Sequence, residues 1–415
     1  MRTITRRNFL RTAAALPAAS FLTRYHAMAA PEKGRVKIRD IKTMIFQGPD
    51  RNYTLVRIDT DAGLFGIGEG YGSPGVGVKE QVHALKPVLI GKDPLEIDAL
   101  YTGLGTRTDG SAHALMRAVS GIEMALWDTA GKILGVPAST LLGGRFRDKV
   151  RVYDHAAPRN MWDKASCREW AQKVKADKSG FTCHKFGLRH TNPADDFGRD
   201  LTNRMLSSKE LRLVRQGFEN CREAIGWDHD IMCHCHWEYD LRTSIQYAEA
   251  VESMKPTWLE DSMPVNYSES WPKLCAASRV PICTGENWMR RADALPFVLN
   301  RGCDILHPDL RNTGGFLETK KMADLAELFA LPMANHNTGS LINTMATIQW
   351  ASAIRDYLAC ETIIGKGDWM DDVILHDGPV VKDSFVHVPA KPGLGIELNP
   401  DVIKAHLFRG EVWWG

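Results

Sequence analysis

Six residues that can bind a cation or move a proton recur at steps of 23 to 27 residues along the second half of the chain. They are His234, Glu260, Glu286, Asp309, His336 and Glu361. Each stands at or just beyond the end of a short apolar run. Successive strands of a (β/α)8 barrel end in this way, because each strand-and-helix unit uses a couple of dozen residues and the C-terminal strand ends converge on one site. The spacing therefore predicts one active site assembled from consecutive units.

Two carboxylates of this series, Glu260 and Glu286, indicate a metal site. Each follows a strand-like apolar run, and the two runs are one unit apart. Two carboxylates at the same edge of a parallel sheet repel each other unless a cation lies between them. Either one alone could be a solvated loop acid or the partner of an arginine such as Arg290. Their occurrence on neighbouring units favours the metal site.

His234 precedes the two carboxylates and would be the third ligand. It lies in a Cys-His-Cys-His run over residues 233–236, which could suggest zinc bound by all four side chains. Side chains alternate between the two faces of a strand, so the two cysteines point away from His234 and His236. We therefore expect both histidines at the mouth of the barrel and no four-ligand zinc site.

Asp309 and His336, also one unit apart, could form a proton-transfer dyad. A carboxylate that fixes the tautomer of a histidine turns that histidine into an effective base. Most of the 14 histidines are explained better as structural residues. The spacing singles out His336.

The elements that must position these residues begin at residue 149. Short apolar strands alternate there with amphipathic helices, which is typical of a parallel sheet. The strands are expected at 150–153, 182–186, 231–234, 257–260, 282–286, 304–307, 331–335 and 357–361. The fold class is therefore α/β, with a (β/α)7-8 barrel over residues 149–365 and a polar insertion at 189–209 over its mouth.

Residues 31–148 are expected to form an α+β domain that caps this barrel. Antiparallel strands are predicted at 36–46, 53–59 and 64–69, and a helix at 113–134 that stops at Gly135. The Gly- and Pro-rich segment 366–415 should return to pack on this capping domain. Substrate specificity would come from capping loops at 47–53, 70–76 and 106–111.

Residues 1–30 are typical of an export signal. Arg6 and Arg7 precede an Asn-Phe-Leu sequence, a mildly apolar run follows, and Ala-Met-Ala at 27–29 is similar to a cleavage site. The paired arginines resemble the twin-arginine signal, so a periplasmic or exported protein is expected.

The bulk composition excludes several classes of protein. The 415 residues are 44% hydrophobic and 25% charged, and 52 basic against 50 acidic residues give a net charge of +2. Without a dense basic block, neither nucleic acid nor a membrane surface is an expected partner. No run approaches the length of a membrane span. The nine cysteines are expected to be packing residues. A small molecule is the expected partner.

The chain resembles the enolase superfamily, in its mandelate racemase and acid-sugar dehydratase group. The resemblance covers nearly all residues after the signal. Its motifs are Ser-Gly-Ile-Glu-Met-Ala-Leu-Trp-Asp at 120–128, Leu-Leu-Gly-Gly at 141–144, Trp-Leu-Glu-Asp at 258–261, Gly-Glu-Asn at 285–287, Pro-Asp at 308–309, Gly-Gly at 314–315 and Pro-Gly-Leu-Gly at 392–395. It implies a capped barrel and a homo-oligomer.

The resemblance also implies a metal centre and a substrate. Members bind one divalent ion, usually Mg2+, through three acidic side chains, and Glu260 and Glu286 match the second and third. The ion holds the substrate carboxylate and stabilises the enediolate that forms when the α-proton is removed. In the dehydratases the substrate is a sugar acid.

Four further residues match catalytic positions of the group. His336, paired with Asp309, matches the base. Glu361 matches a residue that hydrogen-bonds the enediolate, and His236 matches a histidine that protonates the departing β-hydroxyl.

His234 departs from the family pattern, which has an aspartate at the first metal position. A neutral imidazole would favour Mn2+, Fe2+, Zn2+ or Ni2+ over Mg2+. Alternatively, Mg2+ is bound weakly through the two glutamates, or the position has lost its metal role.

The second departure from the family pattern concerns Lys185 and the position two residues after it. Racemases of the group carry a Lys-x-Lys pair whose second lysine is the opposite-face base, and Gly187 stands there in this chain. Lys185 is retained as a catalytic residue. One base and one acid suit an elimination, so the sequence predicts a sugar-acid dehydratase. The alternatives are a racemase or epimerase of a carboxylate, or an exported sugar-acid-binding protein without activity.

Overall fold

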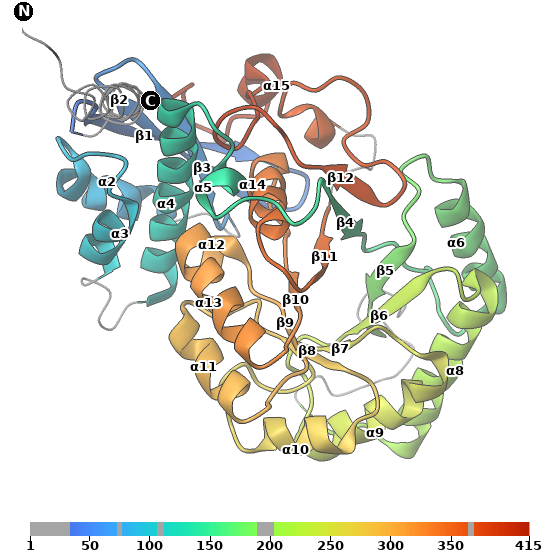
Figure 1. Cartoon of the computed structure of the whole chain (residues 1–415). Helices are drawn as coiled ribbons and strands as arrows, with labels where there is room; N and C mark the ends of the chain where they lie inside the picture. Colours follow the sequence, from blue (N-terminus) through green and yellow to red (C-terminus); the bar gives the residue numbers. More distant parts are fainter. Residues whose placement is uncertain (1–33, 73–76, 106–111, 189–202, 364–368, 415) are drawn as a thin grey trace, which may run out of the picture.

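A computed structural model describes residues 34–72, 77–105, 112–188, 203–363 and 369–414 (Figure 1). The predicted export signal lies outside these residues. So do the capping loop at 106–111, part of the loop at 70–76, and residues 189–202 of the expected insertion. The remainder of that insertion is partly helical, because Ser208 and Lys209 begin a helix.

The N-terminal domain is an antiparallel three-stranded sheet covered by helices. Its strands run in the order β1-β2-β3, as expected, and the longest helix packs over β3. Glycines on β3 permit this contact, since a Cβ atom at Gly68 would lie 2.2 Å from the carbonyl oxygen of Gly121. The elements are β1 (Ile38–Gln47), β2 (Asn52–Thr60), β3 (Phe65–Gly70), α2 (Val78–Leu89), α3 (Ile97–Gly105), α4 (Ala112–Leu134) and α5 (Ala138–Leu141).

The barrel contains all eight predicted strands, parallel and in sequence order. The barrel closes between its first and second strands, where a β-bridge pairs Asp154 with His184. The strands are β4 (Lys149–Tyr153), β5 (Cys183–Phe186), β6 (Asp230–His234), β7 (Leu259–Glu260), β8 (Ile282–Thr284), β9 (Ile305–Leu306), β10 (Met333–Asn335) and β11 (Tyr357–Glu361).

Side chains from all eight strand units fill the barrel interior, so it is a packed core and not a pore. These buried residues are Tyr153, Cys183, Met232, Trp258, Cys283, Ile305, Ala334 and Ala359.

The helices surround the barrel (Figure 1). Several of them begin at a capping side chain. Ser207 and Glu210 form a capping box, and Asp240 accepts a hydrogen bond from Thr243 N. None of the helices in the described part of the chain is long and apolar enough to span a membrane. The helices of the barrel domain are α6 (Lys164–Ala176), α8 (Ser208–Ile225), α9 (Leu241–Val251), η1 (Glu252–Met254), α10 (Ser270–Ala277), α11 (Arg291–Leu299), α12 (Leu310–Thr313), α13 (Phe316–Leu328) and α14 (Leu341–Ser352).

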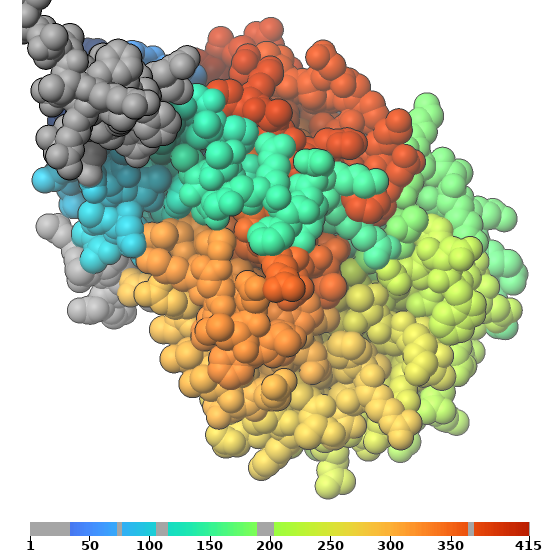
Figure 2. Space-filling model, viewed as in Figure 1, coloured from blue at the N-terminus to red at the C-terminus, as the bar shows by residue number. Residues whose placement is uncertain are grey.

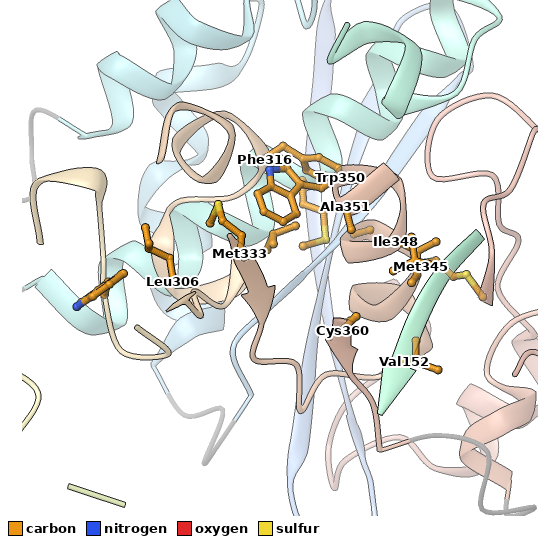
Figure 3. Close-up of a cluster of buried hydrophobic side chains, with 14 of the residues drawn as sticks. Val152, Leu306, Phe316, Met333, Met345, Ile348, Trp350, Ala351 and Cys360 are labelled. Atoms are coloured by element: carbon orange, nitrogen blue, oxygen red, sulfur yellow. The ribbon is translucent and has the colours of Figure 1, made fainter. Parts of the chain in front are cut away.

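Helix α14 is buried along its whole length because it lies between the barrel and the capping domain. Figure 3 shows Met345 and Ile348 of α14 beside Val152 of β4, and Trp350 beside Phe316. This cluster joins the two domains in one hydrophobic core.

The C-terminal segment contacts both domains. Leu394 N donates to Asp128 Oδ1 at 2.7 Å, and Gln47 N donates to His406 O at 2.8 Å, so the segment packs on the capping domain. In Figure 2 it lies in red against the teal residues near α5. It also adds β12 (Phe385–His387) to the free edge of β4, a barrel contact that the sequence analysis did not anticipate. The C-terminal segment also contains two short helices, η2 (Trp369–Asp372) and α15 (Pro400–Ala405).

Candidate active site

The structure brings His234, Glu260 and Glu286 together at the C-terminal ends of three consecutive strands. One donor atom from each residue lies within 4.8 Å of the other two, and all three side chains are buried. His234 Nδ1 is 2.7 Å from Glu260 Oε1. The three residues that the spacing selected therefore form one cluster.

This cluster fits a divalent cation. Glu286 Oε2 is buried and accepts no hydrogen bond from the described residues, and its nearest cationic neighbour is His336 Nε2 at 3.5 Å. A buried carboxylate oxygen without a donor is costly unless a positive charge approaches it. Two carboxylates and one imidazole also form an ordinary donor set for a first-row divalent metal.

Lys185 supplies a positive charge next to this cluster. Its Nζ atom lies 2.6 Å from Glu260 Oε1 and 2.9 Å from Glu361 Oε2. Burial alone would lower the pKa of Lys185, but the two carboxylates raise it well above its ordinary value. Lys185 is therefore a buried ammonium that holds Glu260 and Glu361 in place.

Asp309 and His336 form the predicted dyad. His336 Nδ1 lies 2.8 Å from Asp309 Oδ2. Although burial opposes ionisation, Arg311 and His336 hold the pKa of Asp309 far below its usual range. Burial alone would likewise lower the pKa of His336, but Glu286, Glu361 and Asp309 raise it to about 10. The field of the carboxylates therefore favours the protonated form of this imidazole.

A second polar layer lies inside the barrel, directly below the strand ends. Trp258 Nε1 donates to Glu260 Oε2 at 2.7 Å. The Tyr153 hydroxyl lies 2.8 Å from His307 Nε2 and 3.2 Å from Glu361 Oε2. Burial lowers the pKa of His307 to about 3, so this ring is neutral and serves the network as a hydrogen-bonding group.

A cavity of about 540 Å³ opens above these groups, between the barrel and the capping domain. His234, His236, Glu286, His336 and Glu361 line it on the barrel side. Asp50, Arg51, Tyr53 and Tyr71 line it on the capping side. The described parts of the predicted specificity loops at 47–53 and 70–76 therefore border the same space as the metal cluster and the dyad.

His236 lies in this cavity beside His234, with ring centroids 3.9 Å apart. Both rings are on the same face, while Cys233 and Cys235 are buried on the other, as the alternation predicted. Among the described residues, the four side chains of this run do not form a metal cluster together.

Several residues of the site escaped the sequence analysis. His155 comes two residues after the end of β4 and contacts Glu361, so the same strand-end argument could have found it. Arg311 and Glu69 are 242 residues apart and meet only in the fold. Tyr153 and His307 point into the barrel from apolar strands, where no spacing distinguishes them.

Comparison with known proteins places this architecture in a family. Residues 33–143 match the mandelate racemase / muconate lactonizing enzyme N-terminal domain, and residues 166–402 match the enolase C-terminal domain-like family. A mandelate racemase/muconate lactonizing enzyme-like protein from Rubrobacter xylanophilus has a similar crystal structure, with a TM-score of 0.84 and 28% identity, covering 91% of this chain and 99% of that one.

Several curated relatives of the chain are dehydratases. A D-xylonate dehydratase from Haloferax volcanii is 35% identical over 378 residues, which cover 90% of either chain. A D-galactonate dehydratase from Pectobacterium atrosepticum is 29% identical over 392 residues, which cover 91% of this chain and 97% of the relative.

An α+β domain that caps a barrel with acidic groups and histidines at its strand ends defines one class of protein, the enolase superfamily. This chain belongs to that superfamily and, within it, to the mandelate racemase / muconate lactonizing enzyme family, in the group that contains the acid-sugar dehydratases.

Proposed function

We propose that this protein is a metal-dependent hydro-lyase that removes water from a sugar acid and releases a 2-keto-3-deoxy acid. The observation that carries the proposal is the Asp309–His336 dyad, whose imidazole borders the same cavity as Glu286 and His234. The dehydration of D-xylonate and D-galactonate by the relatives supports the same reaction class.

The chain's own side chains account for the proton transfers. Because Asp309 engages His336 Nδ1, the nitrogen that takes the α-proton is Nε2. The C–H electron pair moves into a bond between the α-carbon and the carboxyl carbon, which gives an enediolate. As this pair returns, the bond from the β-carbon to its hydroxyl breaks, and the hydroxyl leaves as water with a proton from His236.

The first product is an enol. It takes a proton at the β-carbon and loses the proton of its α-hydroxyl, which gives the keto acid. The two histidines restore their protons by exchange with solvent, so the net change is the loss of one water.

His234, Glu260 and Glu286 would hold the metal ion. When bound, a divalent cation supplies positive charge that stabilises the developing enediolate. His234 adds no negative charge to the donor set, so the site favours Mn2+, Fe2+ or Zn2+ over Mg2+ more than three carboxylates would.

The structure around Gly187 supports elimination over racemisation. A Cβ atom at this position would lie 1.8 Å from the carbonyl oxygen of His234, so β5 packs against β6 without room for a side chain. The opposite-face lysine of racemases therefore has no place here, and His336 and His236 supply one base and one acid.

The test is turnover of D-xylonate, D-gluconate, D-galactonate and D-mannonate with added Mg2+ or Mn2+ in deuterium oxide. We expect a 2-keto-3-deoxy acid with solvent deuterium at C3. Exchange at the α-carbon without loss of water would instead identify a racemase or epimerase. Binding without exchange or turnover would identify a sugar-acid-binding protein.

We further propose export through the twin-arginine route and assembly into a homo-oligomer. The sequence at residues 5–11 and the family resemblance support these two points. Replacing Arg6 and Arg7 by lysine should retain the protein in the cytoplasm, which cell fractionation would detect. Light scattering after size-exclusion chromatography would count the subunits, and a monomer would contradict the second point.

A further inference from the structure

His155 forms a second carboxylate–imidazole pair in the same cavity. It follows β4, and its Nε2 atom is in ion-pair contact with Glu361 Oε1. The side chain of His155 is 26% exposed, whereas that of Glu361 is 1% exposed. Both residues line the cavity, and His155 is the more exposed member of the pair.

Both oxygens of Glu361 are already engaged by the protein. Oε1 contacts His155, and Oε2 lies 2.9 Å from Lys185 Nζ, 3.2 Å from the Tyr153 hydroxyl and 3.3 Å from Asn337 N. Burial opposes ionisation, but Lys185, His336 and His155 together hold the pKa of Glu361 well below its ordinary value.

An ionised carboxylate has no proton to donate, and it repels the negative charge of an enediolate. Glu361 is therefore unsuited to the direct hydrogen bond that the family resemblance implied for it. A protonated imidazole whose Nε2–H is held by that carboxylate has a second N–H group, at Nδ1, which it can present to the developing oxyanion, as donors of oxyanion holes do.

We infer that His155 hydrogen-bonds the substrate carboxylate as it becomes an enediolate, and that Glu361 is a positioning residue that orients His155. This inference rests on the proposed function. It leaves the other roles unchanged: His336 takes the α-proton, and His236 protonates the departing hydroxyl. His155 and His236 approach the cavity from different strands, β4 and β6, so they can contact different oxygens of one substrate.

The inference is tested with His155→Asn and His155→Gln, two polar replacements at a partly exposed position. Because removing one oxyanion donor costs about 10²–10³-fold in kcat, we expect at least about a 100-fold loss of kcat with KM changed by less than about threefold. Exchange of the α-proton with deuterium oxide should fall in parallel with loss of water. The matched control is His387→Asn on the exposed face of β12, which should keep wild-type rates.

Ligand binding supplies a readout that does not depend on turnover. The hydroxamate of the substrate resembles the planar enediolate, and the corresponding 3-deoxy acid resembles the substrate but cannot lose water. A group that contacts the enediolate stabilises the hydroxamate selectively. In titration calorimetry, His155→Asn should weaken binding of the hydroxamate at least about tenfold more than binding of the 3-deoxy acid. Glu361→Gln should reproduce this selective loss of affinity.

Each of three results would overturn the inference. The first is a kcat within about twofold of wild type, and the second is equal weakening of both ligands. The third is continued α-proton exchange without loss of water, which would make His155 the leaving-group acid. Thermal unfolding of both His155 variants is measured first. If one variant folds poorly, the other still tests the inference. A wild type inactive on every acid would contradict the proposed function, while the binding comparison would still test His155.

Discussion

Arg311 holds Asp309 with two hydrogen bonds: Nη2 lies 2.7 Å from Oδ2, and Nε lies 3.1 Å from Oδ1. The same guanidinium reaches the capping domain, because Nη1 lies 3.2 Å from Glu69 Oε1. All of these side chains are buried. The orientation of His336, the proposed base, is thus tied through Asp309 to the position of the capping domain on the barrel.

Arg311→Lys should therefore lower kcat about 10- to 100-fold with little change in KM. Lysine keeps the charge but cannot make the two parallel hydrogen bonds, so Asp309 and His336 lose their fixed geometry. Steady-state kinetics on the best acid of the panel would measure this. Arg355→Lys, at an exposed ion pair with Glu327, is the matched control. Equal kcat values for the two variants would show that Arg311 does not align the dyad.

Lys185→Met should destabilise the metal-free protein by about 3–5 kcal/mol, because it leaves buried Glu260 and Glu361 without their shared cation. Added Mn2+ should raise the melting temperature of the variant more than that of wild type, since the ion replaces part of the missing charge. Differential scanning calorimetry with and without a chelator would measure both effects.

The control for this prediction is Lys173→Met, which removes an exposed lysine paired with Glu169. Exposed ion pairs contribute roughly 0–1 kcal/mol to stability. The melting temperature of this variant should therefore be close to that of wild type, both with Mn2+ and with chelator. If Lys185→Met were as stable as wild type in the presence of chelator, the ammonium would not be the charge that holds the two carboxylates together.

The sequence was sufficient to predict the barrel and the residues at its mouth, because both depend on a period. Eight apolar runs end near the C-terminal edge of the sheet, and the polar residue that ends a run must face that edge. Glu260 illustrates the limit of precision: β7 covers only Leu259–Glu260, although the apolar run begins at Thr257.

What the sequence could not predict depends on contacts between distant segments. Arg311 is unremarkable in sequence, and only the packing of β3 over the barrel brings Glu69 to it. Strand β12 has three residues and no periodicity. It forms because the bridge between β4 and β5 lies at Asp154, after the end of β4, which leaves backbone groups of β4 to be paired. His155 lies after its strand, in a stretch with no apolar pattern to mark its direction.

The proposed metal preference depends on His234. His234→Asp would restore a third carboxylate, and we expect affinity for Mg2+ to rise about tenfold or more relative to Zn2+. His234→Ala should weaken binding of both ions. Titration calorimetry on chelator-treated protein would measure the affinities without reference to turnover. An unchanged ratio of Mg2+ to Zn2+ affinity in His234→Asp would show that this position does not contact the ion.

Glu123 gives a pH dependence of stability that is separate from the active site. It accepts hydrogen bonds from Trp127 Nε1 at 2.5 Å, Phe316 N at 2.7 Å and Leu317 N at 2.9 Å, where α4 of the capping domain meets α13 of the barrel. Burial nevertheless raises the pKa of Glu123 from 4.5 to about 8. Its protonated form is therefore the one that the folded state favours.

A carboxyl whose pKa is raised on folding contributes full stability below its unfolded pKa and loses it as the pH rises through the folded value. Between pH 5 and pH 8, the free energy of unfolding of wild type should fall by about 1.4 kcal/mol per pH unit relative to Glu123→Gln, which cannot ionise. Urea denaturation at several pH values would measure the difference, with Glu249→Gln on the surface of α9 as the control. Parallel curves for wild type and Glu123→Gln would mean that the three N–H donors keep this carboxylate ionised in the folded protein.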